Sequence, residues 1–316
     1  MSELALLAFK VAPNVFDLSS GMTYASLRDQ AVRSWMLARA VGGVYKKGKV
    51  LIVGAGVAGI AAAVKAVECG MDVTLVDKDS QPLELQSRAH HRWVGPFMYE
   101  WPAPFSRDQR YPSRDEDSFH AFGRIEPNIP LQRSPEPVRA SLFARDLKDW
   151  FFRFCSSHRR NIRVVVDIEP SSIKNYIKKV SKSSSGSGSR LIANGSIWNH
   201  AVGVGTNQLH PAINESFDTI FLCSGMGLER KLEGVESTPF WEADHLREQR
   251  VTEQRTAIVG GGDGAIQDAL RAILTVEHPL ELVKALEASG EDFQSKQLLA
   301  LSKNFAYSDI WETSGN

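Results

Sequence analysis

Short apolar runs alternate with segments of helical periodicity along the first two thirds of the chain. Each run is five or six residues long, which is typical of strands buried in a parallel sheet. The runs are KVLIV at 49–53, DVTLV at 72–76, IRVVV at 162–166 and DTIFLC at 218–223. This alternation predicts an α/β fold with a Rossmann-like domain, in which strands 49–53, 73–76 and 219–223 share one sheet.

Two other segments have the periodicity of packed helices. Residues 24–41 carry apolar side chains at loosely helical spacing, so we expect a lead-in helix against the first domain. Residues 141–156 place large apolar side chains on one helical face and predict a core helix. Beyond it, 191–198 and 201–204 are expected to be strands of a meander, after a flexible low-complexity loop at 181–190.

A glycine-rich motif joins the first strand to the helical segment that follows it. Gly54, Gly56 and Gly59 form a complete G-x-G-x-x-G. Gly54 permits a tight turn, Gly56 lets the backbone approach a pyrophosphate, and Gly59 lets the helix pack closely on the strand. The N-terminus of the helix, which we expect to end at Gly70, offers free N–H groups to the phosphates.

Asp77 completes this motif. It ends the second strand, 23 residues after Gly54, where a carboxylate accepts hydrogen bonds from a ribose diol. The order of these features along the chain predicts dinucleotide binding: a strand, the glycine-rich loop, a helix, a second strand and an acid. The alternative interpretation is a glycine-rich turn in an ordinary α/β core without a ligand. That interpretation does not explain why an acid stands at position 77. The motif alone fits NAD and FAD equally well.

A second, similar motif lies near the C-terminus. Gly260, Gly262 and Ala265 form a G-x-G-x-x-A between an expected strand at 256–259 and a helical segment. We expect a second phosphate-binding turn here, with a tight turn in an ordinary α/β unit as the alternative. Asp263 at the start of the helix is most simply a favourable N-terminal helix charge, and the alternative is that it hinders a pyrophosphate. No strand ending in a ribose-binding residue follows, so this motif does not show which cofactor it takes.

The segment 81–105 is irregular and rich in charged and aromatic residues. Long loops of this composition are often functional. The alternative is a loop whose Trp and Tyr side chains only cover the edge of the sheet. The candidate catalytic residues are Arg88, His91, Arg92 and Tyr99. Adjacent histidines rarely bind one ion together, so His90 and His91 with His120 are not expected to form a metal site.

Composition narrows the classes of protein and partner. The 316 residues suggest about two domains, and 43% hydrophobic with 23% charged residues is ordinary for a globular protein. Lys+Arg and Asp+Glu both number 37, so no basic excess indicates a nucleic-acid partner. No run of 18 apolar residues and no signal peptide are present, so no membrane partner is expected. Three separated cysteines favour a cytoplasmic location.

Together, the two motifs resemble those of the two-dinucleotide-binding flavoproteins, the glutathione-reductase-like and thioredoxin-reductase-like FAD/NAD(P) oxidoreductases. The first motif, the segment 218–225 and the segment 260–270 (GGGDGAIQDAL) carry this resemblance. It implies FAD at Gly54, Gly56, Gly59 and Asp77, with Ser224 and Gly225 as neighbours. It also implies NAD(P)H as electron donor at Gly260, Gly262 and Ala265, and a role for Arg88 or Arg92 in stabilising the reduced flavin.

The chain departs from that family in two places. It has no pair of closely spaced cysteines, so disulfide reduction is unsupported. The family's C-terminal segment, which closes the FAD site, has no counterpart after residue 276. We therefore expect weak FAD binding unless self-association or a second chain completes the site.

These observations lead to one main expectation and two alternatives. We expect an FAD-dependent oxidoreductase, with flavin reduced by NAD(P)H, acting on a small-molecule substrate or on oxygen. The alternatives are a non-catalytic or remnant nucleotide-binding protein and a single-site NAD-dependent dehydrogenase. The expected parts are a lead-in at 1–45, an FAD-binding domain with its meander at 46–228, and a partial NAD(P)-binding unit at 250–316.

Overall fold

The computed structural model describes a large part of the chain. The described residues are 2–19, 27–44, 48–94, 129–130, 138–182, 189–198, 206–207, 211–225, 233–234, 238–244, 246, 256–259, 263–273, 281 and 288. The chain divides into two compact units, Met1–Ala243 and Asp244–Asn316. Each unit is described by itself below.

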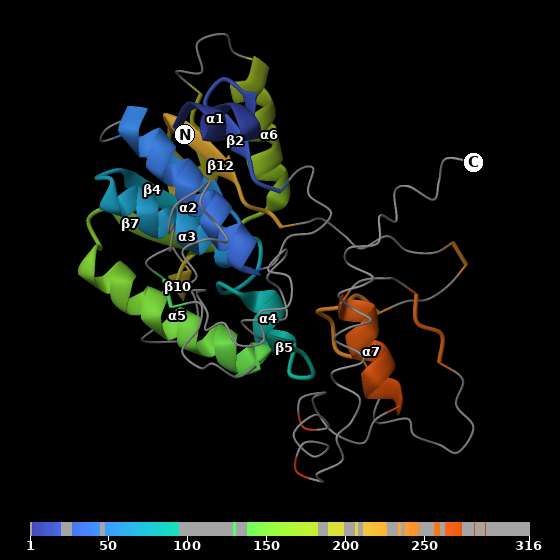
Figure 1. The fold of residues 1–316 in the computed structure, drawn as a ribbon. Coiled ribbons are helices and arrows are strands. Elements are labelled where there is room, and N and C mark those ends of the chain that lie inside the picture. The colour runs from blue at the N-terminus through green and yellow to red at the C-terminus, as the bar shows by residue number, and fades with distance from the viewer. Residues whose placement is uncertain are drawn as a thin grey trace, which may run out of the picture. The chain divides into compact units, whose positions relative to one another are not determined.

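The first unit is built on one large sheet (Figure 1). Its strand order is β1-β2-β12-β3-β4-β7-β9-β10. The strands are β1 (Lys10–Ala12), β2 (Val15–Asp17), β12 (Thr219–Leu222), β3 (Lys49–Val53), β4 (Asp72–Val76), β7 (Ile162–Val166), β9 (Ser196–Ile197) and β10 (Thr206–Asn207). The five central strands, from β2 to β7, run parallel, whereas β1, β9 and β10 pair antiparallel at the two edges.

Two hydrophobic cores cover the two faces of this sheet. Alternate strand residues such as Ile52 and Leu75 pack with helices α2 (Leu27–Val44), α3 (Val57–Glu68) and α5 (Ala140–Ser157). The intervening residues, such as Leu51 and Val165, pack with α6 (Pro170–Lys182) and with a separate pair of strands, β8 (Leu191–Ala193) and β11 (Ile213–Glu215). Burial of both faces explains why the parallel strands are mostly apolar.

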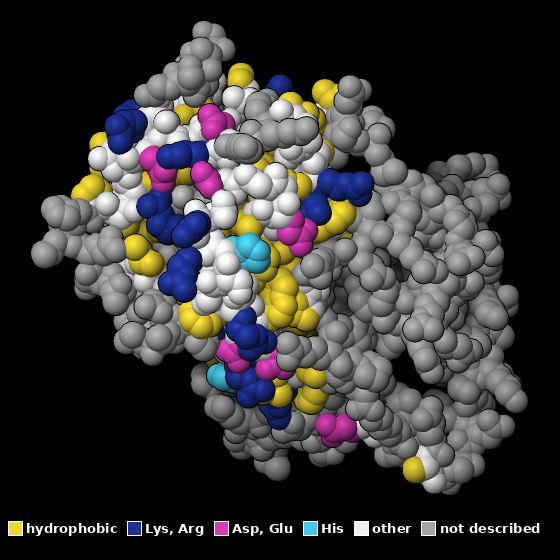
Figure 2. Space-filling model, turned by 90° about the vertical axis from the view of Figure 1, so that its left-hand side faces the viewer, with side chains coloured by type: hydrophobic (Ala, Val, Ile, Leu, Met, Phe, Trp, Pro, Cys, Tyr) yellow, Lys and Arg dark blue, Asp and Glu magenta, His cyan; other side chains and the backbone are white. Residues whose placement is uncertain are grey.

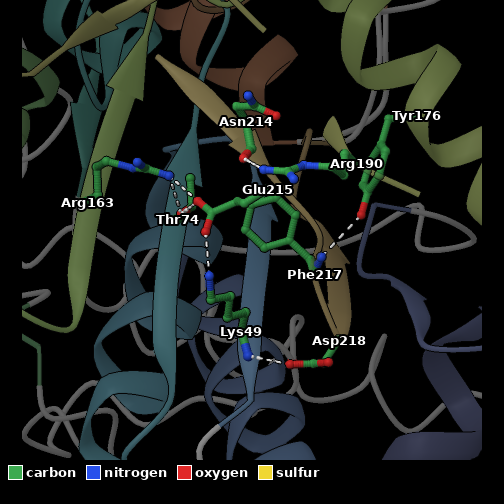
Figure 3. Close-up of polar contacts among 9 residues, drawn as sticks. All are labelled: Lys49, Thr74, Arg163, Tyr176, Arg190, Asn214, Glu215, Phe217 and Asp218. Carbon is green, nitrogen blue, oxygen red and sulfur yellow. Dashed lines mark hydrogen bonds and ion pairs between the residues drawn. The ribbon is translucent and has the colours of Figure 1, made fainter. Parts of the chain in front are cut away.

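A polar cluster ties the β8–β11 pair to the amino-terminal ends of the central strands (Figure 3). Glu215 on β11 accepts hydrogen bonds from Lys49 Nζ at 2.9 Å and from Arg163. The Thr74 hydroxyl also donates to the Glu215 carboxylate, at 3.4 Å. Asp218 accepts a bond from the Lys49 backbone N–H at 2.8 Å. The contacts join four elements far apart in the sequence.

Smaller elements surround this framework. Helix α1 (Ser2–Phe9) precedes β1, and the short helix α4 (Glu84–Arg88) follows β4. Strands β5 (Trp93–Val94) and β6 (Val138–Arg139) form a small antiparallel pair ahead of α5. In the second unit, the structure describes one longer helix, α7 (Asp263–Ile273), in which Arg271 is held by Asp244 at 2.7 and 2.8 Å and by Asp268 at 2.9 Å.

The α/β fold expected from the sequence is confirmed, and strands 49–53, 73–76 and 219–222 do share one sheet. The segment expected as a lead-in with a helix also contributes β1 and β2 to that sheet. The amphipathic helix α6 was not expected. The strand expected at 256–259 is wrong, because those residues are described without regular structure. The strand expected at 201–204 lies outside the described residues.

The surface carries both signs of charge. On the face shown in Figure 2, Lys and Arg side chains lie among Asp and Glu side chains, with hydrophobic side chains between them. Among the described helices, none combines the length and the apolar character that a membrane crossing requires.

Candidate nucleotide-binding site

The glycine-rich loop begins where β3 ends, at the carboxyl edge of the parallel sheet. Gly54 has a φ of +104°, which a residue with a side chain rarely adopts, and its N–H donates to Val76 O at 2.8 Å. The chain then turns through Ala55 and Gly56 into α3, whose first residue is Val57. Both the motif and its place at the end of a central parallel strand agree with the sequence expectation.

The three glycines of the motif meet different surroundings. A Cβ atom at Gly54 would lie 2.3 Å from Cys223 O, and one at Gly59 would lie 1.8 Å from Gly54 O. Both positions therefore exclude any side chain, because the fold itself needs these close approaches. A Cβ at Gly56 would meet no atom within 4 Å. Gly56 therefore faces open space, where a side chain would stand in the position of a ligand.

The N-terminus of α3 points its free backbone groups toward the same space. The N-cap residue Gly56 has extended backbone geometry, and no side chain caps the helix. Ile60 N–H bonds to Gly56 O at 3.0 Å and closes the first turn, so the N–H groups ahead of it have no partner within the helix. Free N–H groups and the positive end of the helix dipole together favour a phosphate. The residues present fit a pyrophosphate.

Asp77 lies beside this loop, at the end of β4. Its carboxylate accepts hydrogen bonds from the backbone N–H of Ala55 and, at 2.9 Å, from that of Asp79. Burial raises the pKa of Asp77, although these two bonds act in the opposite direction. Each carboxylate oxygen keeps a second acceptor position, because each oxygen can accept two bonds. The carboxylate is thus fixed in place and able to bind a ribose diol.

Ser224 and Gly225 lie on the other side of the loop, after β12. A Cβ at Gly54 would be 3.2 Å from Ser224 Cα, so these two residues are in close contact. Gly225 has a φ of +83°. Ser224 is exposed, and its Oγ lies 3.4 Å from Ser19 Oγ. The structure therefore brings Gly54, Asp77 and Ser224 together at one edge, as the sequence predicts.

The loop after β4 places the candidate catalytic residues in different surroundings. Leu83 N–H donates to Ala55 O at 3.1 Å and holds the start of α4 against the glycine-rich loop. Arg88 is 71% exposed and pairs with Glu84. Arg92 is buried, with its guanidinium 3.9 Å from the ring centroid of Phe240 and a bond to the Phe240 carbonyl. His91 is half-buried, and Tyr99 lies outside the described residues. Catalytic roles for these residues remain predictions.

The second glycine-rich motif is only partly described. Gly260 and Gly262 lie outside the described residues, and Ala265 lies in the first turns of α7. On this helix, Ile266 and Ile273 are exposed while Gln267 and Arg271 are buried. The apolar positions Ile266 and Ile273 of this helix therefore do not lie on its buried face within the described residues. Nucleotide binding by this motif remains a prediction.

The described residues offer neither a thiolate at Cys155 or Cys223 nor a cluster of metal ligands. Burial raises the pKa of the Cys155 thiol to about 12 and also raises that of Cys223, a buried residue directly after β12. Both are therefore protonated at neutral pH. In the part of the chain that the structure describes, no three His, Cys, Asp or Glu side chains gather as metal ligands would. His120 lies outside it.

Two polar residues at this edge were missed at the level of sequence. Asp17 ends β2, and Ser19 follows it, so both lie at the carboxyl edge near Ser224. Their segment carries no motif, and a strand of three residues has too little periodicity to be recognised. The alternation of apolar and polar residues over 16–19 is the one signal that points to a strand.

One family model matches part of the chain. It is the alanine dehydrogenase/PNT C-terminal domain, an NAD(P)-binding Rossmann domain, and it matches residues 27–101. The matched region includes the glycine-rich loop and Asp77. No curated protein and no solved structure gives a significant match to the chain.

This match corrects the relationship inferred from the sequence. The expected kinship with the two-dinucleotide flavoproteins is wrong, because the family model that matches is an NAD(P)-binding domain of another family. The error has a physical cause. A G-x-G-x-x-G turn and an acid on the next strand recognise a pyrophosphate and a ribose, which NAD and FAD share. The described chain contains a Rossmann-type nucleotide-binding unit, and the match favours NAD(P) over FAD.

Proposed function

We propose that this chain binds NAD(H) at the glycine-rich loop of residues 54–59 and acts as a single-site dehydrogenase-type oxidoreductase on a small-molecule substrate. The observation that carries the proposal is the loop itself. Gly54 and Gly59 have no room for a side chain, whereas Gly56 opens onto empty space at an uncapped helix N-terminus beside a fixed carboxylate. The family match over residues 27–101 supports NAD(P) as the dinucleotide.

Asp77 favours NAD(H) over NADP(H). Its carboxylate can accept bonds from both hydroxyls of the adenosine ribose, but it would repel a phosphate on the 2′ oxygen. The positive charge of Lys78 acts on Asp77 and lowers its pKa, but the Lys78 ammonium is also paired with Asp79 at 3.4 Å. When bound, the nicotinamide accepts or donates a hydride, and the chain supplies its position.

Titration of the full chain with NADH, NADPH and FAD tests the binding part of this proposal. The readouts are tryptophan quenching and isothermal calorimetry. We expect NADH to bind at least about tenfold more tightly than NADPH. With NADH, the Asp77 carboxylate gains a charge-assisted hydrogen bond from the ribose, whereas with NADPH it faces the 2′ phosphate. Tight, stoichiometric FAD binding without NADH binding would overturn the proposal.

Two variants make the test specific. Gly56→Val should abolish NADH binding with little loss of thermal stability, because the new side chain fills only the open space. Asp77→Ala should weaken NADH binding by about tenfold. It should also reduce the ratio between the affinities for NADH and NADPH. Asp146→Asn, on the exposed side of α5, is the matched control and should change neither affinity.

A second assay addresses catalysis. Reduction of NAD⁺ is followed at the NADH absorbance band with a panel of small alcohols, 2-hydroxy acids and amino acids, including L-alanine. Turnover of any of these compounds supports the dehydrogenase proposal, provided that Gly56→Val abolishes it. Nucleotide binding without turnover across the panel would favour the non-catalytic alternative.

A further inference from the structure

The N-terminal strand β2 extends the carboxyl edge of the sheet beyond β12. It runs parallel to β12, with Val15, Phe16 and Asp17 opposite Ile220, Phe221 and Leu222. Leu18 N–H continues the pairing by donating to Leu222 O at 2.9 Å. Because parallel strands end at the same edge, the residues that follow β2 lie beside those that follow β12.

Three polar side chains form a connected chain at that edge. Ser19 donates two bonds to the Asp17 carboxylate, one from its backbone N–H at 2.8 Å and one from its hydroxyl. With the Ser19 hydroxyl hydrogen used in this way, the Ser224 hydroxyl donates to Ser19 Oγ at 3.4 Å. Both hydroxyl hydrogens are then used within this chain of side chains. The exposed Ser224 oxygen and the Asp17 carboxylate can still accept further hydrogen bonds.

The charge of Asp17 acts on two neighbouring groups. The negative charge of Asp17 adds to the effect of burial in raising the pKa of Cys223, the residue before Ser224. Asp17 also lies near Arg33 of α2, whose pKa burial lowers and the charges of Asp29 and Asp17 raise. The carboxylate of Asp17 thus lies near both Cys223 and Arg33.

The order of the strands relates this chain of side chains to the glycine-rich loop. In the sheet, β3 lies between β4 and β12, and β2 follows β12. Asp77 stands on the β4 side of the loop, and Ser224 touches Gly54 on the β12 side. A dinucleotide has one nucleoside on each side of its pyrophosphate. A pyrophosphate over the loop, with one ribose at Asp77, therefore directs the other nucleoside toward β12 and β2.

We propose that Asp17, Ser19 and Ser224 form a hydrogen-bonding site for the hydroxyls of the second ribose of the bound dinucleotide. The inference rests on the proposed function and adds to it a role for the N-terminal strand. Ser224 is the residue that contacts the ligand, and Asp17 and Ser19 orient the Ser224 hydroxyl. The shared chemistry of these groups, hydroxyl acceptors backed by a carboxylate, suits a diol.

The test compares three ligands on the full chain by isothermal calorimetry. ADP contains one ribose and the two phosphates, ADP-ribose adds the second ribose, and NAD⁺ adds the nicotinamide. Ser224→Ala and Asp17→Asn should each weaken ADP-ribose and NAD⁺ binding by about fivefold. Neither variant should change the affinity for ADP. The controls are Ser157→Ala and Asp146→Asn on α5, which should leave all three affinities unchanged.

Each other outcome is decisive. Equal losses for all three ligands, with a lower melting temperature, would show a purely structural role and overturn the inference. Unchanged affinities would also overturn it, because the second ribose would then lie elsewhere. Losses for NAD⁺ alone would assign the site to the nicotinamide and reject the ribose. If the unmodified chain binds none of the three ligands, the proposed function itself fails.

Discussion

At the scale of single residues, the glycines of the loop serve two different purposes. Gly54 and Gly59 are required by the fold, whereas Gly56 leaves room for a ligand. Gly59 and Gly54 approach each other so closely that a methyl group at Gly59 would overlap the Gly54 carbonyl. Gly56 has an ordinary φ of −74° and open space above it. Substitutions at these two positions should therefore have different consequences, although both glycines belong to one motif.

We predict that Gly59→Ala lowers the free energy of unfolding by more than about 3 kcal/mol, because backbone atoms must move to relieve the overlap. Gly56→Ala should change it by less than about 1 kcal/mol, since alanine adopts this backbone geometry without strain. Urea unfolding followed by circular dichroism measures both values. Comparable stability of the two variants would show that the close contact at Gly59 is not required.

Asp77 predicts a pH dependence of binding. Its pKa is raised by burial, so protonation of this group favours the folded, unliganded protein. That contribution to stability is complete below the pKa in the unfolded chain and is lost as the pH rises through the raised pKa. Binding follows the opposite trend, because the ionised carboxylate is the better acceptor for the ribose hydroxyls.

NADH affinity should therefore fall as the pH is lowered from about 8 through the pKa of Asp77, whose unperturbed value is about 3.9. Calorimetric titrations at a series of pH values measure this change. Asp77→Asn removes the titrating group, so its weaker affinity should vary less over the same range. An identical pH profile in the two proteins would assign the dependence to another group.

The site residues also show what sequence can and cannot reveal at this scale. Gly54, Gly56 and Asp77 were predictable, because each is required by the local geometry of one short motif. Asp17 and Ser19 were not, because their place beside Ser224 depends on pairing between segments about 200 residues apart. Arg92 is a third case. Its charge drew attention to it as a catalytic candidate, but only the fold shows its guanidinium on the ring of Phe240.

At the scale of elements, the Glu215 cluster fastens strand β11 to the central sheet. Burial alone would raise the pKa of Glu215, but the Lys49 hydrogen bond and the charges of Arg163 and Lys49 outweigh it and lower the pKa. The stabilising effect is therefore present above the pKa of an unfolded glutamate, about 4.3, and is lost as the pH falls through the lower folded value.

We expect Glu215→Gln to lower the free energy of unfolding by about 1 kcal/mol at neutral pH, since two cations lose their partner at a partly exposed site. The difference from the unmodified protein should shrink as the pH falls below about 4. Urea titrations at the two pH values give both numbers. Glu68→Gln, which breaks a surface pair with Lys65 at 3.0 Å, is the control and should cost less. A deficit that persists at low pH would assign the effect to packing.

Elements differed in how far sequence could predict them. Four of the five parallel strands are mostly apolar runs between glycine and helical segments, so they were predictable as strands, and three of them were expected to share one sheet. Helix α6 buries Ile173, Tyr176 and Val180 at helical spacing, yet its many lysines and serines obscure that stripe. Strand β2 has only three residues, and its pairing with β12 supplies the stability that its own sequence lacks.

At the scale of the whole molecule, the chain has one fully described dinucleotide motif and one that is partly described. All residues of the candidate site lie in the unit Met1–Ala243, whereas the second motif belongs to Asp244–Asn316. Residues 256–259 do not form the strand that would have to precede a second phosphate-binding turn. Helix α7 also starts with Asp263, whose charge disfavours a phosphate at a helix N-terminus.

We therefore predict a stoichiometry of one NADH per chain. Calorimetry of the full chain gives this number directly. Gly56→Val should abolish all binding, because a branched side chain at the open position excludes the pyrophosphate from the first site. Gly262→Val should leave both affinity and stoichiometry unchanged, because a stoichiometry of one assigns the nucleotide to the first motif alone. A stoichiometry near two, reduced to one by Gly262→Val, would instead establish the second motif as a nucleotide site. It would also show that the acidic start of α7 is compatible with a bound phosphate.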